Sequence, residues 1–152
     1  MPRTPRLGRR FTRWLRARVS RRAQTRPAPE PCDVLVVGRD RDFRESLTML
    51  LAADGVSATE AAFGRDALCR LPQHAPRLVV LDLDDEPSDG IAFLETKRML
   101  WRRDLRAVPV LALTGDELLA RSAEELGATL VLRKPTRFDV LLDRVDLELA
   151  RA

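Results

Sequence analysis

Three side chains of complementary chemistry stand at or just past the ends of apolar runs in the sequence. They are an acid, Asp82, a hydroxyl, Thr114, and an ammonium group, Lys134. An aspartate can act as a nucleophile toward a phosphoryl group. A threonine hydroxyl and a lysine ammonium can hydrogen-bond to phosphoryl oxygens and neutralise their charge. If the fold brings these three residues together, they form a site for phosphoryl transfer to Asp82.

The apolar pattern around these residues predicts strands that alternate with helices. Continuous apolar runs are typical of strands buried on both faces, whereas apolar residues three to four positions apart indicate helices. We expect strands at 34–37, 56–61, 78–81, 108–113 and 129–132, and helices at 43–53, 65–71, 91–101, 116–126 and 138–150. This alternation predicts an α/β domain in which helices cover both faces of a parallel sheet. Ligands bind beyond the carboxyl ends of such strands, so the three side chains should meet at one edge.

Several short stretches resemble a response regulator receiver domain in their order and spacing over residues 33–150. The matching stretches are 34–37, 78–83, 89–90, 108–115, 127–128 and 134–135. The resemblance implies a flavodoxin-like (βα)5 doubly wound parallel sheet with strand order 2-1-3-4-5. It implies that Asp82 is the phosphoacceptor, Thr114 the switch hydroxyl and Lys134 the lysine that contacts the phosphate.

The same resemblance implies a role in signalling and not in catalysis. Receiver domains are modules of two-component phosphorelay systems, so the expected partner is a histidine kinase or another signalling protein. The resemblance also implies that the fourth helix, the fifth strand and the last helix build the signalling face. Leu118 and Leu119 are adjacent in that fourth helix, so one of them should lie toward the surface.

The sequence departs from the receiver pattern directly after the first predicted strand. The family places two acids there, which hold Mg²⁺, whereas this chain has Gly38 and Arg39, and Asp40 comes one position later. Mg²⁺ prefers about six hard oxygen ligands, and only Asp82, with Asp40 if any, remains to supply side-chain oxygens. Arg39 would place a permanent positive charge where the dication belongs, and we expect it to pair with Asp82. No metal or other cofactor is therefore expected, unless the domain is competent for phosphorylation, when Mg²⁺ would be required.

Two further positions differ from the family pattern. Glu86 stands four residues after Asp82, where the family has a proline, and Val131 stands at the aromatic switch position; the chain has no tyrosine. These departures favour a pseudo-receiver, a binding module with weak or no Mg²⁺-dependent phosphorylation at Asp82. A conventional phospho-accepting single-domain response regulator stays open, because Arg39 could be a solvated surface arginine that leaves the pocket accessible.

A phosphatase of the haloacid dehalogenase type is a second alternative. Asp82 has another acid two residues on, and Thr114 and Lys134 follow, which is similar to the first three motifs of those enzymes. Their nucleophile lies on the first strand of the domain, however, whereas Asp82 lies on the third predicted strand. Their later acidic pair is also missing, because Asp143 and Asp146 fall inside a predicted helix. We therefore rank this alternative low.

Charge divides the chain into an arginine-rich tail at 1–23, a proline-rich linker at 24–31 and a receiver-like domain at 32–152. Residues 1–31 hold ten arginines and one acid, a net charge of +9, whereas the rest holds 17 basic and 22 acidic side chains, a net −5. A helix in the tail would carry an apolar stripe and a cationic face, able to bind an anionic membrane, a nucleic acid or an acidic partner. A disordered basic arm is the alternative, because isolated helices of this length are marginal in water.

Composition argues against a membrane-spanning or disulfide-linked protein. No apolar stretch approaches the roughly 18 residues that cross a bilayer, and arginines interrupt any apolar run of signal-peptide type. Cys32 and Cys69 form no CxxC pair, and His74, the only histidine, has no metal-ligating neighbours in the sequence. We therefore expect a cytoplasmic protein with reduced, incidental thiols and no transmembrane segment.

Overall fold

The computed structural model of the chain describes residues 30–152, of which Pro31–Ala152 form one compact unit. The predicted tail at 1–23 and the predicted linker up to residue 29 lie outside the described residues. No helix in the described part of the chain is long and apolar enough to cross a membrane.

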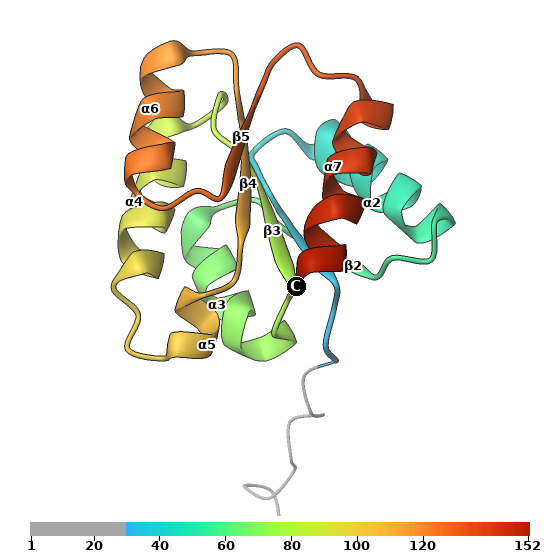
Figure 1. Cartoon of the computed structure of the whole chain (residues 1–152), viewed down its shortest axis with the longest axis horizontal. Helices are drawn as coiled ribbons and strands as arrows, with labels where there is room; N and C mark the ends of the chain where they lie inside the picture. Colours follow the sequence, from blue (N-terminus) through green and yellow to red (C-terminus); the bar gives the residue numbers. More distant parts are fainter. Residues whose placement is uncertain (1–29) are drawn as a thin grey trace, which may run out of the picture. The chain divides into compact units, whose positions relative to one another are not determined.

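Five parallel strands form a single sheet in the order β2-β1-β3-β4-β5 (Figure 1). They are β1 at Val34–Val37, β2 at Ala58–Ala61, β3 at Leu78–Asp82, β4 at Val110–Thr114 and β5 at Leu130–Arg133. This order confirms the predicted flavodoxin-like fold, with the reversal of strand order between β1 and β3. Because all strands are parallel, their carboxyl ends meet at one edge of the sheet.

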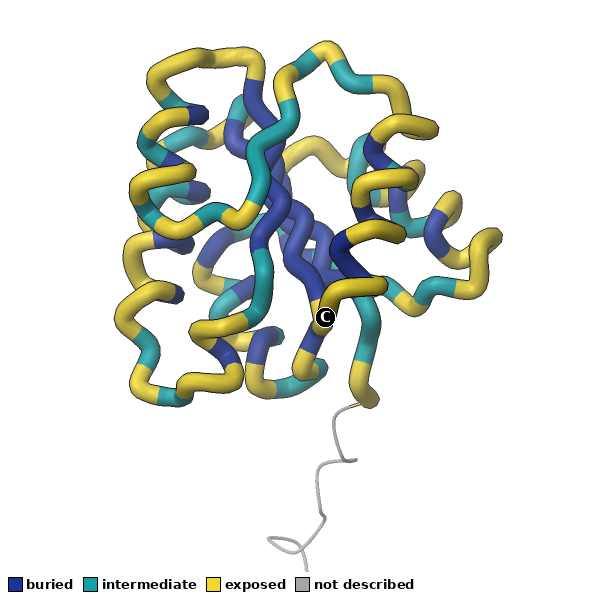
Figure 2. Tube along the Cα trace, in the orientation of Figure 1, coloured by how far each residue is buried: buried dark blue, intermediate teal, exposed yellow. Residues whose placement is uncertain are grey.

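Helices cover both faces of the sheet. They are α2 at Arg41–Ala53, α3 at Gly64–His74, α4 at Pro87–Arg98, α5 at Arg103–Arg106, α6 at Glu117–Glu125 and α7 at Phe138–Arg151. Helices α2 and α7 lie on one face, and α3, α4, α5 and α6 lie on the other (Figure 1). The β1, β3 and β4 strands are buried along their whole length between these layers (Figure 2).

The alternation of side chains along the central strands divides the interior into two cores. In β1, Val34 and Val36 pack with α2 and α7, whereas Leu35 and Val37 pack with α3, α4 and α6. Phe93 of α4 is the largest fully buried side chain and lies in the second core. Burying a large aliphatic or aromatic side chain contributes about 1.5–3 kcal/mol to the stability of the fold. The side chains on both faces of β1 therefore stabilise this strand, which leads into the site.

Two helices differ from the sequence-based prediction. Helix α3 was expected to end at Pro72, but it continues to His74. Pro72 lies in the last turn, where its missing N–H removes one intrahelical bond, and the helix closes where the Ala75 N–H donates to the Leu71 carbonyl at 3.0 Å. Helix α4 begins at Pro87, a favourable first helical residue, and ends at Arg98, before the predicted end at residue 101. The short helix α5 was not predicted, because four residues carry no helical period.

Candidate functional site

The structure brings together two of the three predicted site residues directly. Asp82 is the last residue of β3, and its side chain is 2% exposed; Lys134 follows β5. The Lys134 ammonium donates to both carboxylate oxygens of Asp82, at 2.8 Å to Oδ1 and 2.9 Å to Oδ2. A charged lysine therefore covers the carboxylate that the sequence identified as the acceptor.

Thr114, the third predicted residue, contacts a different acid. It is the last residue of β4 and fully buried, and its hydroxyl donates to Asp84 Oδ1 at 2.6 Å. The Gly115 N–H also donates to Asp84, at 3.1 Å to Oδ2, and Lys134 Nζ lies 3.5 Å from the same oxygen. In the sequence, this acid, two residues past Asp82, was noted only for its likeness to a dehalogenase motif, and it was assigned no role in the site. Asp84 thus links the ends of β3, β4 and β5.

The charged groups in this cluster shift one another's pKa values. Burial alone would raise the pKa of Asp84, but the Thr114 hydroxyl, the Gly115 N–H and the Lys134 ammonium together hold that pKa below its ordinary value. Burial alone would lower the pKa of Lys134, but the carboxylates of Asp82 and Asp84 outweigh it and raise that pKa. Lys134 therefore stays charged at neutral pH. Its ammonium also lies 5.9 Å from the centre of the Phe43 ring.

At the end of β1, Gly38 lies directly against Asp82. A Cβ atom added to Gly38 would stand 3.0 Å from the Cβ atom of Asp82, a tight contact. Asp40, the acid that follows, caps helix α2: its Oδ1 accepts from the Phe43 N–H at 3.2 Å. The structure thus accounts for Asp40 as a helix cap.

The expected ion pair between Arg39 and Asp82 is wrong. Arg39 Nη1 instead lies 3.4 Å from Glu86 Oε2, and its guanidinium carbon stands 4.6 Å from the centre of the Phe63 ring. The Arg39 side chain is 45% exposed, so this pair is screened by solvent. Lys134 already occupies both oxygens of Asp82, whereas Glu86 and Phe63 offer Arg39 an anion and an aromatic face.

Arg44 of α2 is a site residue that sequence reasoning missed. Its Nη1 donates to the carbonyl of Gly38 at 2.6 Å and to that of Arg39 at 3.1 Å. Its side chain is only 13% exposed, and its Nε lies 3.5 Å from Glu60 Oε1 on β2. In the sequence, the only signal for Arg44 was its position near the start of the helix that follows the first strand. Arg44 fixes the backbone of the loop that follows β1.

The side chains present do not form the oxygen shell that Mg²⁺ prefers. Within residues 30–152, no group of three or more acidic, histidine or cysteine side chains is placed to hold a metal ion. The oxygens of Asp82 accept from Lys134, and the carbonyls of Gly38 and Arg39 accept from Arg44. Mg²⁺ requires a near-octahedral set of oxygens at about 2.1 Å, and here a lysine and an arginine engage the nearest candidates.

The doubly wound sheet, with Asp82 and Lys134 at its carboxyl edge, defines a flavodoxin-like α/β protein with a charged cluster at the usual ligand position. The family model of the response regulator receiver domain matches residues 34–146. The chain belongs to this family, whose members serve two-component systems.

Individual relatives agree with this assignment. The chain is 37% identical over 123 residues to the response regulator MprA of Mycolicibacterium vanbaalenii, covering 80% of this chain and 52% of that protein. It is 32% identical over 124 residues to the KDP operon transcriptional regulatory protein KdpE of Escherichia coli, covering 78% of this chain and 52% of that protein. The chain therefore spans about half the length of these curated relatives.

Solved structures show the same fold. A putative response regulator from Chloroflexus aurantiacus superposes with a TM-score of 0.70 at 29% identity, covering 80% of this chain and all of that one. The signal receiver domain of a response regulator from Bermanella marisrubri gives a TM-score of 0.71 at 26% identity, covering 79% of this chain and 99% of that one. Both matches support the receiver fold across the described domain.

Proposed function

We propose that this receiver domain is a pseudo-receiver of a two-component phosphorelay, acting through protein–protein contacts with weak or no Mg²⁺-dependent phosphorylation at Asp82. One observation carries the proposal: neither of the two residues directly after β1 is a carboxylate, because Gly38 abuts Asp82 and Arg39 turns to Glu86. The acid pair that holds the metal in the family is thus replaced. Phosphoryl transfer to an aspartate depends on a metal to neutralise the transferring charge, and a fixed lysine does not coordinate the group in its place.

Conventional phosphorylation is the second candidate, and a specific observation favours it. Asp82 and Lys134 are in direct contact, and Thr114 lies one carboxylate away through Asp84. These are the residues that the family resemblance assigns to accepting and reading the phosphate. If Lys134 moves from Asp82 to a phosphoryl oxygen, the acceptor becomes available without any change in fold. The metal shell, however, still lacks the acids after β1.

Intact mass measurement separates the two candidates. The natural chain is incubated with acetyl phosphate, with and without Mg²⁺, beside an Asp82→Asn control. A pseudo-receiver gains little or no phosphoryl mass under either condition. A Mg²⁺-dependent gain of one phosphoryl group at an ordinary receiver rate, lost in Asp82→Asn, would overturn the proposal. It would mean that Asp40, or one of the acids from Asp84 to Glu86, serves the metal.

The partner is proposed to be a histidine kinase or another signalling protein that contacts α6, β5 and α7. Leu118 on α6 is 73% exposed and Val140 on α7 is 46% exposed, which gives this face apolar contact points. Amide hydrogen exchange with a cognate partner should slow on α6, β5 and α7. Protection confined to α2 and α3 would refute this surface.

The remaining parts of the proposal concern the low-ranked enzyme and the chain outside the domain. Asp82 ends the third strand, which argues against a haloacid dehalogenase. We expect no Mg²⁺-dependent turnover of p-nitrophenyl phosphate, and measurable turnover would support the enzyme instead.

We assign the receiver to 32–152, the linker to 24–31, and salt-sensitive binding of nucleic acid or an anionic membrane to 1–23. A cytoplasmic location is part of the same proposal.

A further inference from the structure

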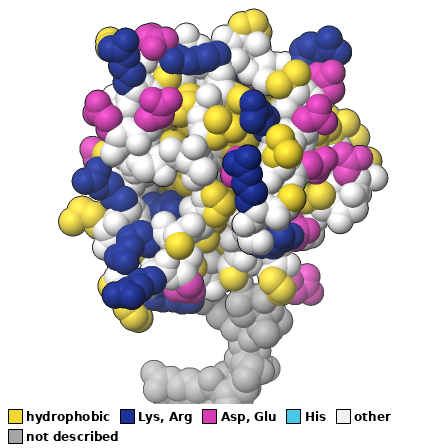
Figure 3. Space-filling model, viewed as in Figure 1, with side chains coloured by type: hydrophobic (Ala, Val, Ile, Leu, Met, Phe, Trp, Pro, Cys, Tyr) yellow, Lys and Arg dark blue, Asp and Glu magenta, His cyan; other side chains and the backbone are white. Residues whose placement is uncertain are grey.

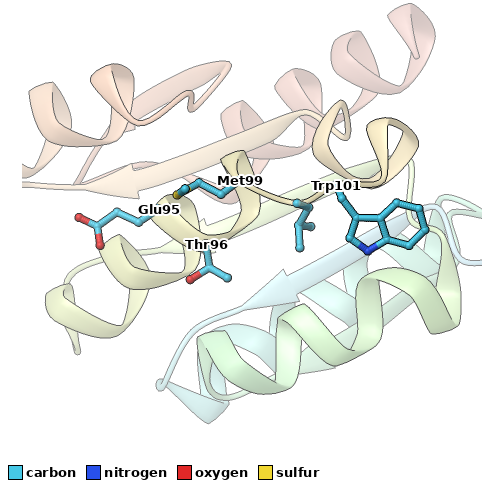
Figure 4. Close-up of a pocket in the computed structure, with 5 residues that line it drawn as sticks. Glu95, Thr96, Met99 and Trp101 are labelled. Atoms are coloured by element: carbon cyan, nitrogen blue, oxygen red, sulfur yellow. The ribbon is translucent and has the colours of Figure 1, made fainter.

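A cationic surface with two exposed apolar side chains lies where α4 passes into α5, remote from Asp82. Met99 is 81% exposed and Trp101 is 86% exposed. With Glu95, Thr96 and Leu100 they line an open hollow (Figure 4). We name the hollow and the arginines around it, Arg98, Arg102, Arg103 and Arg106, the α4–α5 patch. Large apolar side chains exposed together on a small domain mark an interaction surface.

Positive charge predominates in the α4–α5 patch. Its four arginines stand against two acids, Glu95 at the hollow and Asp104, which pairs with Arg102 at 2.6 Å. Lysine and arginine side chains gather over the end of the domain that holds α5 (Figure 3). These arginines and acids leave a net charge of +2, so the complementary surface carries acids.

The patch is held in a fixed shape before any partner arrives. Lys97 of α4 is buried and donates to the Arg106 carbonyl at 2.8 Å, and Arg106 Nη1 donates to the Leu100 carbonyl at 3.1 Å. Leu105 of α5 is buried in the core beneath. These contacts tie both ends of the segment to the domain, and a preorganised surface loses less entropy on binding than a flexible one.

We propose that the α4–α5 patch binds an acidic segment of a partner protein, which inserts apolar side chains against Met99 and Trp101 and pairs its carboxylates with the surrounding arginines. Tryptophan, methionine and arginine are the residue types enriched in protein–protein contacts. Met99 and Trp101 line a hollow that can receive apolar side chains of a peptide segment, so a protein partner fits better than an anionic lipid surface. This surface is separate from the α6–β5–α7 face and does not depend on phosphorylation of Asp82.

The direct test uses the full chain with Trp14→Phe, which leaves Trp101 as its only tryptophan. The probe is a synthetic helical peptide with Asp and Glu on one face and Leu and Phe on the other. We expect a blue shift of Trp101 emission and amide shifts at residues 95–106. A matched peptide with Asn and Gln in place of the acids should bind at least about tenfold more weakly. Equal binding of both peptides would overturn the acidic specificity.

Variants separate the α4–α5 patch from the arginine-rich tail, which also attracts acids. Trp101→Ala, and Arg102→Glu with Arg103→Glu, should each weaken peptide binding at least about tenfold, as expected at the centre of an interface. Met49→Ala, and Arg41→Glu with Arg65→Glu, remove the same kinds of exposed side chain from α2 and α3 and should leave affinity unchanged. Circular dichroism checks that every variant is folded.

Three outcomes would overturn the proposal. If both patch variants bind the peptide as tightly as the unaltered patch does, the binding site lies elsewhere, for instance in residues 1–23. A Trp101 blue shift with phosphatidylglycerol vesicles, but not with the peptide, assigns the patch to a lipid surface. A Trp101 signal that depends on protein concentration alone assigns it to contacts between copies of the chain.

Discussion

The Asp82 carboxylate, almost completely buried, is paired with Lys134, which follows β5. Removing one partner of a buried ion pair leaves an uncompensated charge and costs about 3–5 kcal/mol. The Lys134 side chain is 29% exposed and keeps partial access to water. The ion pair with Asp82 is therefore strong, yet Lys134 can leave Asp82 for another anion. The Asp84 N–H also donates to Asp82 Oδ1 at 3.1 Å, and the Thr114 hydroxyl in turn donates to the Asp84 carboxylate.

Restoring carboxylates after β1 should restore metal binding. Gly38→Asp with Arg39→Asp supplies two acids beside Asp82 and removes one cation. Mg²⁺ affinity should therefore rise at least about tenfold, which is the lower end of the change in metal affinity when residues around a metal are substituted. Acetyl phosphate should then add one phosphoryl mass, lost again when Asp82→Asn is combined with the pair. Calorimetry with Mg²⁺ and intact mass measure the two effects.

Two controls define what this repair means. Gly38→Ala with Arg39→Ala introduces the same Cβ contact with Asp82 but no carboxylate, and it should bind Mg²⁺ no better than the natural chain. Arg39→Ala alone should help less than the acidic pair, because it removes a cation without adding a ligand. If the acidic pair folds yet binds no Mg²⁺, then Gly38 and Arg39 do not stand in the family's metal position.

Lys97 should make stability depend on pH in the alkaline range. Burial lowers its pKa from 10.5 to about 8, so the unfolded chain binds more protons than the folded one between these values. The free energy of unfolding should therefore rise from about pH 8 to about pH 10, by roughly 1–3 kcal/mol at ~1.4 kcal/mol per pKa unit. Urea unfolding at several pH values measures this rise.

Lys97→Met should remove the rise, whereas Arg98→Met, one residue away on the exposed side of α4, should keep it. Burial raises the pKa of the Cys32 thiol, which acts in the opposite sense, but this thiol is present in all three proteins and cancels in the comparison. An identical pH dependence in Lys97→Met and in the natural chain would show that the buried ammonium is not the cause.

Helix α2 connects the end of β1 to the core, and its cap explains why the third residue of the loop is an acid. Asp40→Ala removes the acceptor for the Phe43 N–H and should lower the free energy of unfolding by about 1 kcal/mol. Because Asp40 acts as a cap, the same change should leave Mg²⁺ binding by the repaired Gly38→Asp, Arg39→Asp chain unaltered. A loss of Mg²⁺ affinity with unchanged stability would instead identify Asp40 as a metal ligand.

Strand positions could be predicted because continuous apolar runs depend on local sequence alone, whereas the strand order was implied by the resemblance to receiver domains. Val34–Val37 was predicted to the residue, and the strand at Leu78–Asp82 extended the prediction by one. The contacts within the site could not be predicted in this way. That Thr114 contacts Asp84, and that Arg39 turns to Glu86, depends on side-chain directions that only the packed loops determine. Arg44 was missed because its acceptors are backbone carbonyls, which leave no pattern in the sequence.

Charge is distributed unequally along the whole chain, with +9 in residues 1–31 and −5 in the rest. The packed unit Pro31–Ala152 contains both hydrophobic cores and the whole sheet. The sources of stability described for this domain therefore lie within residues 31–152. Binding of anionic surfaces and folding should then be separable properties.

Truncation of the chain to begin at Pro31 should keep stability and lose adhesion. The free energy of unfolding should match the full chain within about 0.5 kcal/mol, the usual range for changes that touch no core. The full chain should bind DNA or phosphatidylglycerol vesicles at low salt and release them as salt shortens the Debye length from about 30 Å at 0.01 M to about 8 Å at 0.15 M. Replacing the ten arginines of residues 1–31 by glutamine is the matched control, because it removes the charge and keeps the length. A large loss of stability on truncation would show that residues 1–30 belong to the fold. Adhesion that persists in the glutamine variant would move the binding site into the domain, where the arginines around Trp101 are the first residues to test.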